Sequence, residues 1–158
     1  MSINIRPFEG RDAGAVVALA LRAWEPVHCS MGRVLGPEIN AQVYPDWRAS
    51  QEQDVRKACA EQIASVACAE EKIVGFVTVA ISGPEQPGEI YMIAVDPTCQ
   101  RDGVGRSLTE HALQQVRDAG CRVAVVGTGG DPGHAPARGL YEACGFTALP
   151  LVNYYRLV

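Results

Sequence analysis

The chain has 158 residues, of which 47% are hydrophobic and 20% are charged, and its formal net charge is -4. A chain of this length can bury one sizeable core, so residues 1–158 are expected to form a single domain. The acidic balance disfavours nucleic-acid binding, because nucleic-acid-binding faces neutralise phosphates with clustered Lys and Arg.

No segment has the pattern of a membrane anchor or a secretion signal. No apolar run approaches the roughly 20 residues that cross a bilayer, and residues 1–9 lack the charged-then-apolar order of a signal peptide. We therefore expect a cytoplasmic protein without a membrane partner. Six scattered cysteines without a C-x-x-C pair favour reduced thiols over disulfides or a metal site.

The first quarter of the chain predicts a strand followed by helices. Residues 3–7 alternate apolar and polar side chains, as a short strand does. An amphipathic helix is expected from Asp12, with Glu25-Pro26 as its end. Residues 28–36 should be irregular, and Pro37 is placed to begin a short helix.

A longer helix from Asp46 and an antiparallel hairpin are expected next. Residues 65–69 and 73–81 are two apolar runs joined by a short polar turn, which is typical of neighbouring strands in a hairpin. Gly75 in the second run indicates a bulge. A loop with two prolines then leads to a buried strand over residues 89–95.

The second half of the chain has a strand, helix and strand pattern. Residues 104–118 place apolar side chains on one helical face, and residues 121–126 read as the next strand. A crossover of this kind makes its two strands parallel, so the sheet is expected to be mixed. A short helix over residues 135–144 follows, and residues 147–158 should close the chain as one or two strands.

The turn that opens the helix at residue 104 is suited to phosphate. Gly103 and Gly105 let the backbone approach a ligand, and Arg101 and Arg106 add positive charge. The first backbone N–H groups of a helix lack partners and carry roughly half a positive charge. The turn is neither a Walker loop nor a dinucleotide fingerprint, since Leu108 stands where the third glycine would be. A tight turn without a ligand is the alternative.

Two separate motifs resemble those of the GCN5-related N-acetyltransferase (GNAT) family. One is Q-x-x-G-x-G at residues 100–105, directly after AVDP, and the other is AR-x-LYE-x-x-GF at residues 137–146. The resemblance implies an α/β fold with a mixed, mostly antiparallel sheet, a parallel strand pair at the cofactor site and flanking helices. The strand ending at Val95 and the strand at 121–126 should diverge there, where ligands of open sheets bind.

The resemblance also implies a function. Such an enzyme moves an acetyl group from acetyl-CoA to a primary amine, on a small molecule or a peptide, by direct transfer in a ternary complex and without a metal. The implied cofactor-binding residues lie on the strand, in the loop and before the last helix: Ile93, Ala94, Val95, Gln100, Arg101, Asp102, Gly103, Val104, Gly105, Arg106, Ser107 and His134. Many relatives have an asparagine in place of His134, which is expected either to contact the cofactor or to cap the loop.

Two residues are candidates for catalysis. Tyr141 matches the tyrosine of the family motif and is expected to donate a hydrogen bond or a proton to the departing thiolate, with simple packing as the alternative. Glu89 matches the base of one branch of the family. By two-residue alternation it would share a face with Tyr91, Ile93 and Val95. A solvated Glu89, with Tyr91 or water as the base, is the alternative.

The acceptor is the least defined part of the sequence interpretation. Specificity is expected from residues 25–60, the loop at 82–88 and the C-terminal strand with Tyr154 and Tyr155. Dimers are common among relatives, so a homodimer is compatible with the resemblance. The rival interpretations are a catalytically silent CoA-binding or regulatory module and an unrelated nucleotide-binding domain. Tyr141 together with the intact loop at residues 100–105 favours the enzyme over the silent module, and the nucleotide-binding domain would be stabilised by ATP or NAD instead of CoA.

Overall fold

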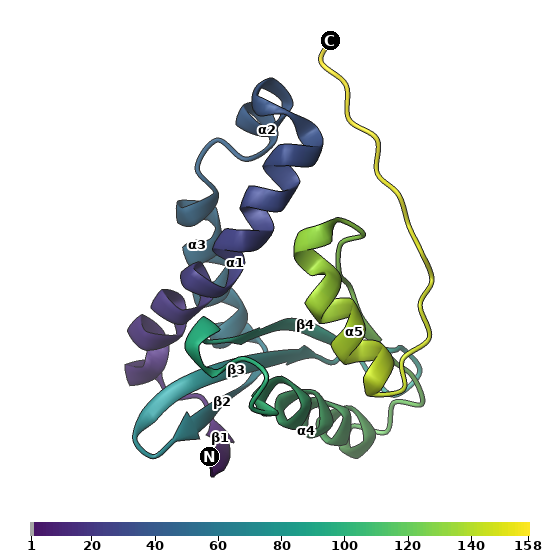
Figure 1. Cartoon of the computed structure of the whole chain (residues 1–158). Helices are drawn as coiled ribbons and strands as arrows, with labels where there is room; N and C mark the ends of the chain where they lie inside the picture. Colours follow the sequence, from purple (N-terminus) through teal and green to yellow (C-terminus); the bar gives the residue numbers. More distant parts are fainter. Residues whose placement is uncertain (1) are drawn as a thin grey trace.

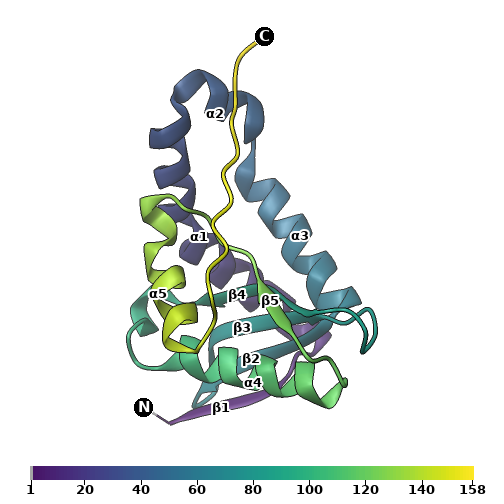
Figure 2. The ribbon, with the colours of Figure 1, turned by 90° about the vertical axis from the view of Figure 1, so that its right-hand side faces the viewer.

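The computed structural model describes residues 2–158, which build one five-stranded sheet with helices on both faces (Figures 1 and 2). The strands lie side by side in chain order: β1 (Ile3–Pro7), β2 (Ile63–Ala69), β3 (Lys72–Ala80), β4 (Gly88–Val95) and β5 (Ala124–Val126). The first three pairings are antiparallel and β4 with β5 is parallel. The predicted mixed sheet is confirmed.

Five α-helices and three short 3-10 helices connect these strands. The α-helices are α1 (Ala13–Leu35), α2 (Pro37–Val43), α3 (Trp47–Glu61), α4 (Val104–Asp118) and α5 (Ala135–Ala143). The 3-10 helices are η1 (Gly10–Asp12), η2 (Pro97–Cys99) and η3 (Pro132–His134). The starts predicted at Pro37, Asp46 and residue 104 agree with these bounds. None of the helices in residues 2–158 has the length and apolarity needed to cross a membrane.

The two faces of the sheet carry separate apolar clusters. On one face, Leu19 of α1 and Val55 of α3 pack around Phe76 of β3. On the other face, Leu108 of α4 lies in a cluster with Val77 of β3. Each of these side chains is at most 1% exposed. Burial of this completeness contributes about 1.5–3 kcal/mol per side chain, so α1 and α4 are held rigidly on opposite faces.

The predicted end of the first helix at Pro26 is wrong, because α1 continues to Leu35. A proline within a helix removes one backbone hydrogen bond, so its helical neighbours need other support. Contacts beyond Pro26 supply it. Ser30 is buried against Asp131, and His28 stacks on Trp47 of α3 with ring centroids 4.2 Å apart. Tertiary packing here outweighs the local signal.

Two register shifts interrupt the hairpins of the sheet. One lies between β2 and β3 beside Gly75, where a bulge was predicted. A Cβ atom at Gly75 would stand 3.0 Å from the Ala94 carbonyl oxygen and 2.9 Å from Leu108 Cδ1, so the glycine lets β4 and α4 come close. The second shift lies at Tyr91, which has no residue opposite it on β3. Its consequence for the site is described below.

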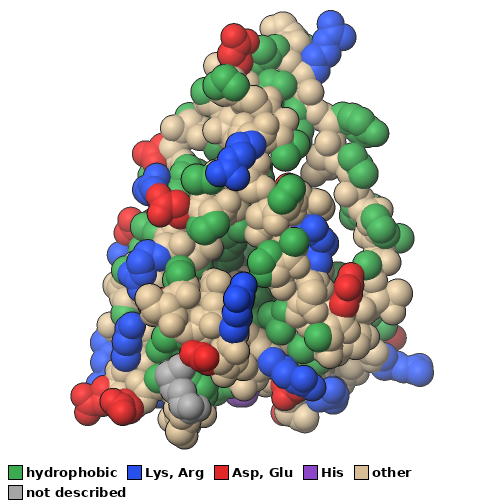
Figure 3. Space-filling view, in the orientation of Figure 1, with side chains coloured by type: hydrophobic (Ala, Val, Ile, Leu, Met, Phe, Trp, Pro, Cys, Tyr) green, Lys and Arg blue, Asp and Glu red, His purple; other side chains and the backbone are tan. Residues whose placement is uncertain are grey.

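The C-terminal tail, residues 147–158, forms no strand, so that prediction is wrong. The tail is extended and passes the open side of the molecule toward α2 (Figures 1 and 2). Leu149 and Leu151 are each 83% exposed and Tyr154 is 93% exposed. Figure 3 shows apolar side chains exposed along this extended segment. The apolar pattern was that of a strand, but a strand also requires a hydrogen-bonded neighbour.

Candidate cofactor and active site

A cavity of about 660 Å³ opens where β4 and β5 separate. The two strands pair only from Gly88 with Ala124 to Ile90 with Val126. Beyond that point β4 continues to Val95, while the chain after Val126 turns into a loop. The predicted divergence of these strands is confirmed, and the cavity has the size usual for a small-molecule site.

The edge of β4 that faces the cavity carries unpaired backbone groups. Residues 92–95 pair with β3 on one side, but β5 has left the other side. Their N–H and C=O groups on that side are therefore available to a ligand, because buried peptide groups need partners. An extended chain with amide groups could complete the sheet there.

The N-terminus of α4 borders the same cavity. Gly103 caps the helix with φ of +82°, a left-handed conformation that L side chains rarely adopt. The first helical hydrogen bond runs from the Ser107 N–H to the Gly103 carbonyl over 3.0 Å. The N–H groups of the three residues between them therefore have no helical acceptor and can bind an anion.

Gly105 serves packing as well as ligand approach. A Cβ atom there would stand 3.1 Å from Leu140 Cδ2, so the glycine lets α5 lie close to the start of α4. A Cβ atom added at Gly103, which lines the cavity, would by contrast meet no other atom within 4 Å. Glycine is thus required at the two positions for different reasons: at Gly105 for close packing of α5, and at Gly103 for the left-handed backbone.

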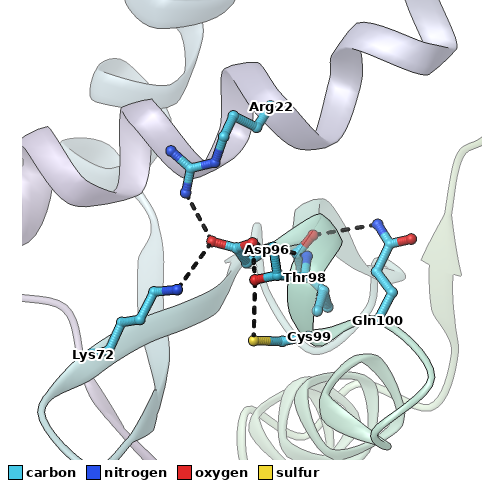
Figure 4. A network of polar contacts seen from close by, with 7 residues as sticks. Arg22, Lys72, Asp96, Thr98, Cys99 and Gln100 are labelled. Atoms are coloured by element: carbon cyan, nitrogen blue, oxygen red, sulfur yellow. Dashed lines mark hydrogen bonds and ion pairs between the residues drawn. The ribbon is translucent and has the colours of Figure 1, made fainter.

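The Asp96 carboxylate ties together the elements around this loop (Figure 4). It accepts hydrogen bonds from the Thr98 N–H over 3.0 Å and the Thr98 hydroxyl over 2.7 Å. Arg22 of α1 donates to its second oxygen over 2.8 Å, and the Lys72 ammonium of β3 lies 3.8 Å away. The Asp96 side chain is 3% exposed. One buried charge therefore joins α1, β3 and η2 at the end of β4.

Hydrogen bonding keeps Asp96 ionised. Burial alone would raise the pKa of this carboxyl, but the hydrogen bonds from Thr98 and Arg22 outweigh burial and hold its pKa well below its usual range. Sequence reasoning missed Asp96, Arg22 and Lys72 as a unit. The available signal was an aspartate between an apolar strand and Pro97, a pattern typical of a helix N-cap.

Tyr141 lies in the wall of the cavity, 8% exposed, with its ring edge-on to Phe146 at 5.9 Å between centroids. Burial raises the pKa of Tyr141 to about 12, and the nearby Cys144 thiol adds to the effect. The phenol therefore remains protonated at neutral pH and can act as a hydrogen-bond donor.

A polar cluster joins η3 to α1 on the other side of the cavity. The Ser30 hydroxyl donates to one Asp131 oxygen over 2.6 Å, and His134 Nδ1 contacts the other. Arg138 fixes the loop by donating to the carbonyls of Gly129 and Asp131 over 2.7 and 2.8 Å. Since Asp131 occupies Nδ1, Nε2 is the ring nitrogen of His134 left for the cavity that this residue lines.

Asp131 remains charged in this cluster. Burial would raise the pKa of Asp131, but the hydrogen bonds from Ser30 and His134 lower it further than burial raises it. An ionised carboxylate on Nδ1 holds the proton of a neutral imidazole on that nitrogen, which leaves a lone pair on Nε2. Sequence reasoning missed Ser30 and Asp131; the D-P-G-H turn was the only local signal.

The bulge at Tyr91 changes the predicted catalytic face of β4. Ile93 and Val95 pack with the α4-side cluster, to which Ile90 also belongs, so Glu89 lies on the opposite face. The prediction that these residues share one face is wrong, because the extra residue reverses the alternation. Among residues 2–158, those that line the cavity include Tyr91 but not Glu89.

Most of the other expected cofactor residues line the cavity: Ile93, Ala94, Val95, Gln100, Arg101, Gly103, Gly105, Arg106 and His134. Asp102 and Ser107 are not among the lining residues, and the Val104 side chain points into the α4-side core. Arg106 pairs with Glu110 over 2.9 Å, which raises its pKa and partly compensates its charge. Within residues 2–158 no three His, Cys, Asp or Glu side chains gather as a metal site.

The comparison with known proteins agrees with this geometry. Residues 34–146 match the model of the acetyltransferase (GNAT) family. A mycothiol acetyltransferase from Thermomonospora curvata is 32% identical over 146 residues, covering 92% of this chain and 44% of that protein. One from Amycolatopsis mediterranei is 30% identical over 154 residues, covering 92% and 46%. The chain belongs to the GNAT family, and it spans less than half the length of these relatives.

Solved structures show the same fold. The aminoglycoside N-acetyltransferase AAC(6')-Iy in complex with CoA superposes with a TM-score of 0.67 at 19% identity, covering 99% of this chain and 95% of that one. The PaiA N-acetyltransferase from Thermoplasma acidophilum in complex with coenzyme A gives 0.65 at 18% identity, covering 93% and 91%. At these identities the likeness concerns the fold alone.

Replacing Asp96 by Asn should lower the free energy of unfolding at pH 7 by about 1.5–3 kcal/mol, because the charged hydrogen bonds are lost. The native pKa is depressed, so the carboxylate contributes fully above its ordinary value of 3.8 and its contribution is lost as the pH falls below that value. The difference in the free energy of unfolding between wild type and Asp96→Asn should therefore decrease from pH 4 toward pH 2.

Urea unfolding at several pH values measures this difference. Asp54→Asn, at an exposed position on α3, is the matched control and should unfold like wild type at pH 7. An Asp96→Asn protein as stable as the control would show that the buried carboxylate does not hold these elements together.

Proposed function

We propose that residues 1–158 form a single acetyl-CoA-dependent N-acetyltransferase domain that acts on a primary amine. One observation carries this proposal. A single cavity connects the free N–H groups of α4, the unpaired edge of β4 and the protonated Tyr141. These are, in order, partners for a diphosphate, for an amide-containing arm and for a thiolate.

The residues of the cavity fit the cofactor. The diphosphate would lie on the N–H groups of residues 104–106, in the open space beside Gly103, with Arg101 nearby. The pantetheine amides would pair with β4 at Ile93 to Val95. Gln100, whose side-chain amide donates to the Val95 carbonyl over 3.4 Å, supports the turn between the two regions.

The reaction needs a proton acceptor first. A free alkylamine with a pKa of about 10.4 is mostly protonated at pH 7, and its deprotonation costs roughly 4–5 kcal/mol at 1.36 kcal/mol per pKa unit. Acetyl-CoA supplies the acyl group as a thioester with a thiolate as leaving group. The residues of this chain must then take the amine proton and stabilise the developing oxyanion through a backbone N–H of β4. They must also stabilise the departing thiolate.

We assign the proton acceptor to His134 in preference to Glu89. His134 lines the cavity and Asp131 holds its Nδ1, so the lone pair of Nε2 is available to a bound amine. Glu89 lies in the paired part of β4, between Ala80 and Val125, and outside the residues that line the cavity. Tyr91 lines the cavity and stays the second candidate.

Tyr141 is assigned to the departing thiolate. With its pKa raised to about 12, the phenol is a much weaker acid than an ordinary thiol with a pKa of about 8.5. Full proton transfer to the thiolate is therefore uphill, and donation of a hydrogen bond is the favoured form of assistance.

The acceptor is proposed to be a small molecule. Relatives at about 30% identity are named mycothiol acetyltransferases. The net charge of -4 favours a cationic amine in approach to the site. A catalytically silent CoA-binding module is the alternative, and it predicts binding of acetyl-CoA without thiol release against any amine.

Tyr141→Phe should reduce kcat by about 10- to 100-fold, the equivalent of one hydrogen bond to a charged group, while the affinity for acetyl-CoA changes little. Thiol release with a panel of amines measures kcat, and calorimetry measures the affinity. Tyr154→Phe, in the exposed tail, is the control and should match wild type. Equal turnover of Tyr141→Phe and wild type would remove Tyr141 from the mechanism.

His134→Gln should reduce kcat/KM by about 10²-fold, because glutamine hydrogen-bonds but does not accept a proton at neutral pH. Glu89→Gln should stay within a few-fold of wild type. The opposite ranking, with Glu89→Gln inactive and His134→Gln active, would transfer the role to Glu89.

A further inference from the structure

The cavity has two chemically different ends. Arg101 and Arg106 line it at the start of α4, beside the proposed diphosphate site. The strand β4 leads away from that end, because Tyr91 lies four residues before Val95, about 13 Å along a strand. There α1 and α5 stand on either side of the opening above β4 (Figure 1). This second end lies beyond the stretch of β4 assigned to the cofactor and is left for the acceptor.

Apolar side chains line this second end, which we call the acceptor end. Trp24 and Val27 come from α1, Tyr91 from β4 and Pro136 from α5. The Trp24 ring meets Phe76 of the core edge-on at 6.2 Å between centroids, which holds it in place. Tyr91 is 49% exposed, although its ring is large and apolar. Apolar surface inside a cavity favours an apolar ligand, because its burial stabilises the complex.

The carboxylates beside the acceptor end are engaged by other groups of this chain. Asp131 accepts a hydrogen bond from Ser30 over 2.6 Å and contacts His134. Glu25 follows Trp24 in the sequence but pairs with Arg48 of α3. Among residues 2–158, those that line the cavity include no Asp or Glu. A ligand with several ammonium groups needs such partners, because a charge taken out of water is costly unless it is paired.

The aromatic character of α1 continues beyond the acceptor end. His28, which follows Val27, stacks on Trp47 with ring centroids 4.2 Å apart and meets Tyr44 edge-on at 5.4 Å. Burial lowers the pKa of His28 below its ordinary value of 6.5, so the ring is uncharged at neutral pH. The surface that leads from the cavity toward α2 and α3 therefore starts with neutral rings.

We infer that the acceptor is a primary amine with a single amino group on an apolar body, aromatic or branched, in preference to a polyamine or an aminoglycoside. The inference rests on the proposed function and names the substrate class of that same site. The amino group lies at Nε2 of His134 and the body lies against the apolar side chains of the acceptor end. The nitrogen bonds to the acetyl carbon as the carbon–sulfur bond breaks, and the amine proton passes to His134.

A matched pair of amines tests the substrate class. In 4-methylbenzylamine a methyl group stands where p-xylylenediamine has a second aminomethyl group. Thiol release from acetyl-CoA should give a kcat/KM about 10-fold or more higher for the monoamine, because the second ammonium of the diamine has no partner at the acceptor end. Spermidine and kanamycin should be poorer still. Equal or faster turnover of the diamine, spermidine or kanamycin would overturn the inference and leave the proposed function standing.

Val27→Asp places a carboxylate at the acceptor end and should lower the ratio of the two kcat/KM values about 10-fold, because the second ammonium gains a partner. Misfolding would reduce both rates without favouring the diamine. Val34→Asp, at a position of α1 that is 66% exposed, is the control and should keep the wild-type ratio. An unchanged ratio in Val27→Asp would contradict the inferred placement of the amine.

Binding separates this inference from the proposed function. With CoA present, 4-methylbenzylamine should shift the amide resonances of Trp24, Val27 and Tyr91 at lower concentration than p-xylylenediamine. Such binding without thiol release from any amine would contradict the proposed function and support the inferred ligand class. Tighter binding of the diamine, or no shift from either amine, would overturn the inference.

Discussion

The buried charge of Asp96 is the interaction on which the site depends. Its oxygens receive hydrogen bonds from η2 and from Arg22, with Lys72 close by, so the end of β4 is fixed relative to α1 and β3. The loop that follows must then turn within a few residues into α4. The position of the free N–H groups of residues 104–106 is thus set by a carboxylate outside the cavity lining.

The sheet supplies the second constraint. Because β4 and β5 separate after Ile90, the edge of β4 is left open. This open edge borders the same cavity as the start of α4 and the buried Tyr141. Close packing of Gly75 on β4 and of Gly105 on Leu140 holds the surrounding helices near this opening. The same separation leaves β5 as a short strand whose outer edge is not paired with any strand of residues 2–158.

Local patterns predicted much of this architecture. The strands, the amphipathic face of α4, the parallel step and the glycine turn follow from periodicity and from turn chemistry, and the paired motifs identified the family. The errors have tertiary causes. α1 continues past Pro26 because Ser30 and His28 find distant partners, and the bulge at Tyr91, which local alternation does not signal, reverses the face of Ile93.

The network around Asp96 and the cluster of Ser30 with Asp131 join residues more than 70 positions apart. No local pattern reports such contacts. The tail shows the converse case, since its sequence has the character of a strand but no strand of residues 2–158 pairs with it.

The proposed function places the cofactor in the cavity between β4 and α4, with its diphosphate on the start of α4. Titration of nitrogen-15-labelled protein with CoA, followed by amide resonances, tests it most directly. CoA should shift the amides of Val104, Gly105 and Arg106 together with those of Ile93 and Val95, whereas pantetheine, which lacks the diphosphate, should shift only the β4 amides. Unchanged α4 amides at saturating CoA would show that the diphosphate does not bind at the start of α4.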